Sequence, residues 1–184
     1  MASGKPKFYW DTAPLIAWIT DEKRADPSEM AGLAGVSELV DSGKAVLMTS
    51  VLWRGEVFDS SLTVAQRKRL EAAFDGRSLV EIAIDSRVMT LASEIRSFHA
   101  NSKKKDTLKN VTLPDAIHLA TAILYDATEF HTFDGARAAG KKGGLLLLDG
   151  NVANHRLKIC VPKAAQLRLE WGSPADPSDE TGDS

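Results

Sequence analysis

The chain has 184 residues, of which 43% are hydrophobic and 26% are charged, the composition of an ordinary soluble globular protein. This length predicts one medium-sized domain with a hydrophobic core. The formal net charge of -2 neither indicates nor excludes a nucleic-acid partner, so any nucleic-acid site would have to be a local basic patch. The sequence shows no signal-peptide pattern and no apolar run of membrane-span length, and its single cysteine, Cys160, excludes an internal disulfide. We therefore expect a cytoplasmic protein with no membrane partner.

The first part of the chain predicts a strand that leads directly into a helix. The apolar run 7–10 ends at Asp11, and the segment behind it has apolar residues at helical spacing and Pro14 in its first turn. A polar segment separates this helix from a second one over roughly 30–42. A buried strand over 44–50 follows.

The middle of the chain predicts three helices around one short extended segment. The expected elements are helices over 51–62 and 63–76, a strand or extended segment over 78–84, and a helix over 86–100. Ser50 is a candidate N-cap for the first of these helices, and Asp85 for the last.

The last third predicts one more helix, beginning near Leu113, and then a strand over 129–133. Two apolar runs, 145–149 and 158–162, are each short enough to be strands. Cys160 lies in the second run, where we expect it to be a small buried side chain.

Strands that alternate with amphipathic helices predict an α/β fold with a parallel sheet that is covered by helices on both faces. We expect one domain over residues 1–172. The acidic segment 173–184, rich in Ser, Pro and Gly, is expected to be disordered. In such a sheet, ligands bind outside the carboxyl ends of the strands.

Four acids are predicted near that edge of the sheet. Asp11 and Asp134 follow strands, Asp115 lies in the first turn of its helix, and Glu56 can reach the edge from its helix. Taken singly, each has a simpler explanation as a helix cap, a first-turn acid, a turn residue or a solvated helix residue. Their joint placement favours one cluster. Because clustered carboxylates need a compensating charge and all-oxygen ligands suit Mg²⁺ or Mn²⁺, the pattern indicates metal-assisted phosphodiester hydrolysis.

Four segments resemble, in order and spacing, the PIN-domain ribonucleases, in particular the VapC-like toxins of type II toxin–antitoxin systems. They are FYWDTAPLIAWI, MTSVLWRGEV, LPDAIHLATAILYDATEFHTFDG and ICVP, and the resemblance covers about 7–167. It implies a PIN-like fold, which is a three-layer α/β/α sandwich with a mostly parallel central sheet and Rossmann-like topology, and Mg²⁺- or Mn²⁺-dependent endonucleolytic cleavage of RNA. It also implies a homodimer and a small antitoxin protein as partner. The site residues it implies are the metal ligands Asp11, Glu56, Asp115 and Asp134, with supporting hydroxyls at Thr12 and Thr132.

The departures from the family pattern leave the acids in place and concern substrate choice and regulation. Ala13 stands where members often carry Ser, and the loop after Asp134 is rich in Gly and Lys. An acidic pocket repels RNA, so basic residues must lie at its rim. Candidate segments are 66–69, 102–109 and 137–142. The favoured rim residues are Lys103, Lys104, Lys105, Lys141 and Lys142; the alternative is a solvated charged surface.

Two histidines and two other functions complete the expectations. His118 and His131 are expected to be buried packing residues, with a proton shuttle as the alternative for His118. A Mg²⁺-dependent phosphohydrolase of the haloacid-dehalogenase kind would need a second Asp where the chain has Ala13. The other alternative is a non-catalytic PIN-like module that holds RNA or a protein.

Overall fold

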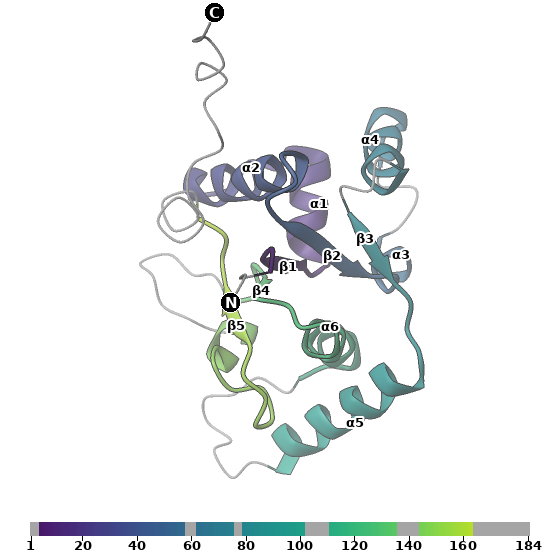
Figure 1. The fold of residues 1–184 in the computed structure, drawn as a ribbon, viewed down its shortest axis with the longest axis vertical. Coiled ribbons are helices and arrows are strands. Elements are labelled where there is room, and N and C mark those ends of the chain that lie inside the picture. Colours follow the sequence, from purple (N-terminus) through teal and green to yellow (C-terminus); the bar gives the residue numbers. More distant parts are fainter. Residues whose placement is uncertain (1–3, 58–61, 76–78, 102–110, 136–143, 164–184) are drawn as a thin grey trace, which may run out of the picture.

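The computed structural model describes residues 4–57, 62–75, 79–101, 111–135 and 144–163. In these ranges one all-parallel sheet has the strand order β3-β2-β1-β4-β5 (Figure 1). Its strands are β1 (Lys7–Trp10), β2 (Val46–Ser50), β3 (Val80–Ile82), β4 (Glu129–His131) and β5 (Lys158–Cys160). The helices are α1 (Thr12–Thr20), α2 (Pro27–Asp41), α3 (Trp53–Glu56), α4 (Val64–Asp75), α5 (Ser86–Asn101) and α6 (Leu113–Leu124), with a 3₁₀ helix η3 (Gly144–Leu148) before β5.

Helices cover both faces of the sheet, as Figure 1 shows. The alternation of side chains along β1 divides the core into two clusters. Phe8 and Trp10 pack with α1, α2 and α4 on one face. Tyr9 packs with α5 and α6 on the other. The predicted three-layer α/β/α sandwich is confirmed.

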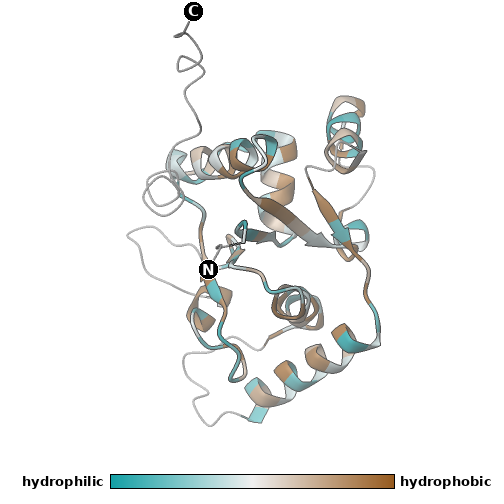
Figure 2. Ribbon diagram, in the orientation of Figure 1, coloured by the Kyte–Doolittle hydropathy of each residue, from teal (hydrophilic) through white to brown (hydrophobic). Residues whose placement is uncertain are grey.

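Helix α6 is the most deeply buried helix of the second layer. Every residue from Ala116 to Ala122 is buried, and Figure 2 shows α6 coloured mostly hydrophobic while α5 alternates with polar residues. The buried Thr121 hydroxyl is satisfied by the Ile117 carbonyl at 2.7 Å. A helix that is apolar nearly all round has to lie between other layers. No helix in the described ranges combines the length and the apolarity needed to span a bilayer.

The strand order places a topological switch point between β1 and β4. From β1 the chain builds β2 and β3 on one side and then crosses to β4 and β5 on the other. Ligands of open parallel sheets bind at the carboxyl ends of the two strands that flank such a point. The backbone N–H of Asp11 donates to the His131 carbonyl at 3.3 Å, which joins the ends of these two strands. The switch point is therefore the place where a site is expected.

Helix α2 begins earlier than predicted, at Pro27 instead of residue 30. Asp26 is its N-cap and accepts a hydrogen bond from the Ser28 N–H at 2.9 Å, and Pro27 occupies the first turn. Asp followed by Pro is a local helix-start signal. At Gly32 the helix packs directly on the segment after β5, since an added Cβ would lie 2.1 Å from the Pro162 carbonyl oxygen.

Two predicted elements differ from the structure. The helix expected over 51–62 is only the single turn α3 before residues 58–61, which lie outside the described ranges. Ser50 is the last residue of β2 and not a helix N-cap, although its hydroxyl accepts from the Leu52 N–H at 3.2 Å.

The run 145–149, predicted as a possible strand, falls mostly in the 3₁₀ helix η3. Gly144, the first residue of this helix, has a φ of +46°, which glycine adopts without the strain that other residues would have there. Leu145, Leu146 and Leu148 are buried in the core on the α6 side. The run 158–162 does contain β5, and Cys160 lies in it, half-buried. The segment 173–184 lies outside the described residues.

Candidate active site at the carboxyl edge of the sheet

Asp11 links β1 to α1 and is only 7% exposed. Its carboxylate is the N-cap of α1 and accepts from the Ala13 N–H at 3.0 Å. Burial raises the pKa of Asp11 to about 6, although the Thr132 hydroxyl and the neighbouring His118 favour the charged form; Glu56 raises the pKa further. Near neutral pH this position therefore holds a buried negative charge that a nearby cation would stabilise.

Glu56 is the last residue of α3, the single-turn helix that follows β2, and its side chain reaches the carboxyl edge of the sheet near Asp11. Its Oε2 atom accepts hydrogen bonds from the Thr12 hydroxyl and, at 3.0 Å, from His118 Nε2. Partial burial raises the pKa of Glu56, but these two donors outweigh it, and the pKa lies below its ordinary value of 4.5. Glu56 is therefore ionised and oriented by Thr12 and His118.

His118 connects the acidic edge to the core of the sheet. It is 3% exposed, as expected of a packing histidine. Because an ionised carboxylate can only accept, Nε2 must carry the proton that points to Glu56. On its other side, Nδ1 lies 2.8 Å from the Tyr9 hydroxyl. Burial raises the pKa of Tyr9 well above its ordinary value, so the phenol keeps its proton and can donate it to Nδ1.

Asp134, which follows β4, is held by one hydrogen bond from its own N–H to a hydroxyl and by one from a backbone N–H to its carboxylate. The Thr132 hydroxyl accepts from the Asp134 N–H at 2.9 Å, and Asp134 Oδ2 accepts from the Leu145 N–H at 3.2 Å. An added Cβ at Gly144 would lie 2.5 Å from Asp134 Oδ1. Gly144 thus lets the start of η3 approach the Asp134 carboxylate.

Asp115 occupies the third helical position of α6, where it forms a capping box with Thr112. Its Oδ2 accepts from the Thr112 N–H at 3.1 Å and from the Thr112 hydroxyl at 2.7 Å. In return, Thr112 Oγ1 accepts from the Asp115 N–H. One carboxylate oxygen of Asp115 is therefore used by its own helix, and among the described residues no hydrogen bond to the other oxygen, Oδ1, is found.

The structure links the predicted acids unequally. Asp11 and Glu56 interact electrostatically and share Thr12 and His118 as neighbours. In the described ranges, no three of the four acids bring their oxygens within 4.8 Å of one another. Mg²⁺ is usually bound through one or two carboxylates and keeps several waters, so direct contact with all four is not required. An all-oxygen donor set around a buried, destabilised Asp11 carboxylate fits Mg²⁺ or Mn²⁺.

A second cluster of possible metal ligands, which sequence reasoning missed, meets the distance criterion for a metal site but no other. The potential ligand atoms of Glu129, His131 and Cys160 all lie within 4.8 Å of one another. However, Trp10 Nε1–H donates to His131 Nδ1 at 3.1 Å, so His131 Nε2 carries the proton and donates to Glu129 at 2.8 Å. Lys158 occupies the other Glu129 oxygen at 2.9 Å. Neither ring nitrogen offers a free lone pair, and the cluster is a closed hydrogen-bond network.

The predicted basic rim cannot be placed. Lys103, Lys104, Lys105, Lys141 and Lys142 lie outside the described residues. Of the described candidates, Arg69 contacts both Asp21 oxygens at 2.9 Å and lies over the Trp18 ring. Its charge is therefore already paired.

Asp11 and Asp134 follow the two strands that flank the switch point, and Glu56 interacts with Asp11. That the four acids form one functional site remains a prediction. His118 is the residue whose connection to Glu56 the sequence did not reveal, because a single histidine one helical turn after Asp115 carries no pairing signal. In comparisons with known proteins, no family model matches the chain and no curated protein matches it.

Proposed function

We propose that the chain is a Mg²⁺- or Mn²⁺-dependent endoribonuclease whose site is formed by Asp11, Glu56, Asp115 and Asp134. The observation that carries the proposal is the buried Asp11 carboxylate, with its pKa raised to about 6, beside the ionised Glu56 at the switch point of the sheet. Two such acids at a ligand-binding edge are unfavourable without a cation. The same edge is where parallel sheets bind substrates.

A bound divalent cation would activate water and offset charge on the phosphodiester. The chain's own groups fix the acids that would hold it. The Thr12 hydroxyl and His118 Nε2–H keep Glu56 ionised and in one orientation. The Thr132 hydroxyl favours the charged form of Asp11. The Leu145 N–H fixes one oxygen of Asp134.

The test is cleavage of a bulk RNA pool by the purified full-length protein in Mg²⁺ and in Mn²⁺, with EDTA as a control. Asp115→Asn should abolish the discrete fragments while the variant stays folded, since Asn preserves an oxygen for the capping box. Asp126→Asn is the matched control, because Asp126 is an exposed acid beyond the far end of α6. Equal cleavage by wild type and Asp115→Asn would contradict the site assignment.

A non-catalytic RNA-binding module is the second candidate. It is favoured by the helix-capping roles of two of the four acids. Asp11 and Asp115 each have a local structural role that would keep them in place without catalysis. RNA retention without cleavage in either metal would support this candidate. A phosphohydrolase would instead cleave small phosphate esters, although Ala13 occupies the position of its second acid.

The finer part of the proposal, a cytoplasmic toxin that dimerises and is silenced by a small antitoxin, is supported only by the sequence resemblance. Its test is growth arrest on expression in bacteria. Asp115→Asn should relieve the arrest, and so should co-expression of a small protein encoded next to this chain. Size-exclusion chromatography would measure the oligomeric state.

A further inference from the structure

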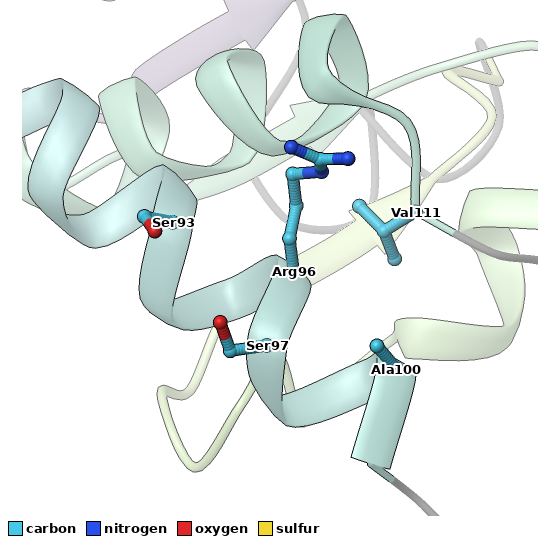
Figure 3. A pocket seen from close by; sticks show the side chains of 5 residues that line it. All are labelled: Ser93, Arg96, Ser97, Ala100 and Val111. Atoms are coloured by element: carbon cyan, nitrogen blue, oxygen red, sulfur yellow. The ribbon is translucent and has the colours of Figure 1, made fainter.

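A cavity of about 460 Å³, open to solvent, lies on the surface between the C-terminal half of α5 and the segment that leads into α6, and four of its five lining residues are exposed. Figure 3 shows its lining residues, which come from these two elements. They are Ser93, Arg96, Ser97, Ala100 and Val111. The volume is within the range of small-ligand sites.

Three of the five lining residues, Ser93, Arg96 and Ser97, carry side-chain hydrogen-bond donors of the kind that bind phosphate. Ser93 and Ser97 are four residues apart on α5, so their hydroxyls lie on one side of the helix. The Arg96 side chain extends from α5 beside Val111 in Figure 3. Within the described ranges Arg96 forms no ion pair, and none of the lining residues is acidic. A guanidinium fork with neighbouring hydroxyls matches the oxygens of a phosphate group.

The cavity lies at the same end of α6 as Asp115. Val111, which is buried in its wall, directly precedes Thr112, and Thr112 donates two hydrogen bonds to the Asp115 carboxylate. A strand of RNA bound at Asp115 would therefore carry its next phosphates past Arg96. This matters because the acidic edge itself repels the RNA backbone.

We propose that the cavity is a subsite for a backbone phosphate of RNA beside the scissile bond, with Arg96 as its cationic group and Ser93 and Ser97 as its hydroxyl donors. The identity of the polymer rests on the proposed nuclease function. The binding of the phosphate rests on the cavity, on the Arg96 guanidinium, which has no ion pair with any described residue, and on the two hydroxyl donors.

The experiment measures binding of a labelled single-stranded RNA to the full-length protein by fluorescence anisotropy, in EDTA and over a series of salt concentrations. Arg96→Gln should raise Kd by about fivefold and make the salt dependence shallower by about 0.7 in slope, the value for one lost phosphate contact with a single strand. Arg96→Lys should keep most of the affinity. In metal, Arg96→Gln should raise KM about as much and leave kcat unchanged.

Arg156→Gln is the charge-matched control. Arg156 is exposed and precedes β5, so it lies at the amino edge of the sheet, away from Asp115. An Arg96→Gln protein that binds RNA like wild type, or an equal loss in Arg156→Gln, would overturn the subsite. If the wild type binds RNA through Arg96 but cleaves none in any metal, the nuclease proposal fails while the phosphate subsite stands.

Discussion

Two hydrogen-bond networks, each made of an aromatic residue, a histidine and a glutamate, lie on opposite faces of the sheet. In each, an aromatic residue of β1 contacts a histidine, and that histidine contacts a glutamate: Tyr9, His118 and Glu56 on the α6 face, and Trp10, His131 and Glu129 on the α1 face. The contacts are similarly short, between 2.8 and 3.1 Å. The difference lies in what surrounds each glutamate.

The Glu129 carboxylate is shielded from solvent. It is 2% exposed, and Lys158 and the Cys160 thiol complete its surroundings. Burial and the hydrogen bond from His131 act in opposite directions, and with Lys158 added the pKa of Glu129 falls to about 2. Burial and the Glu129 charge raise the pKa of the Cys160 thiol far above its ordinary value, so the thiol is inert as a nucleophile or metal ligand.

Glu56 is open. Its side chain is 30% exposed. It interacts electrostatically with the buried Asp11, whose charge has no paired lysine or arginine among the described contacts. The comparison shows that the distance between possible ligand atoms is by itself not enough to choose between the two clusters as a metal site. Proton positions and charge balance favour the open network instead.

Lys158→Met should have the largest effect, on stability. It leaves the Glu129 carboxylate buried without its cation, which costs about 3 kcal/mol of the free energy of unfolding. Lys163→Met removes a partly exposed pair with Asp26 and should cost less than about 1 kcal/mol. Urea denaturation measures both. Equal losses in the two variants would mean that the Glu129 network is not a closed charge pair, and RNA cleavage should survive in both.

Asp11→Asn should stabilise the metal-free protein at neutral pH, because it removes a buried charge and keeps an N-cap acceptor. The pKa of Asp11 is 3.8 ordinarily and about 6 in the fold. The folded state therefore binds the extra proton, and wild-type stability falls by up to about 3 kcal/mol as pH rises through that window. The variant should lack this fall and also any stabilisation by Mg²⁺. Parallel pH profiles in thermal or urea unfolding would contradict the assignment.

His118→Leu tests whether the open network orients Glu56. It should weaken Mn²⁺ binding, measured directly by titration of the metal alone, by about tenfold to a hundredfold, the usual effect of losing a hydrogen bond to a metal ligand. His118→Gln places an amide donor near the position of Nε2 and should restore most of the affinity. If Gln and Leu bind Mn²⁺ equally weakly, His118 acts through packing and not through Glu56.

Much of the fold was predictable because its signals are local. The strand β1, the helix behind it and the Asp85 cap of α5 follow from apolar spacing and capping residues, and each is confirmed. The early start of α2 also has a local signal, the N-cap Asp26 followed by Pro27, which the prediction of a helix from residue 30 did not use. The leucine run of η3 was ambiguous, since a short apolar run does not separate strand from helix by periodicity.

The α/β order of elements and the placement of Asp11 and Asp134 after parallel strands can be read from the sequence, because strand ends and helix starts are set by neighbouring residues. The partners of the two histidines, in contrast, follow from the tertiary structure. His118 meets Tyr9 across 109 positions and Glu56 across 62, and Trp10 meets His131 across 121. Such contacts depend on strand order and on which face each side chain takes, and no local signal encodes them.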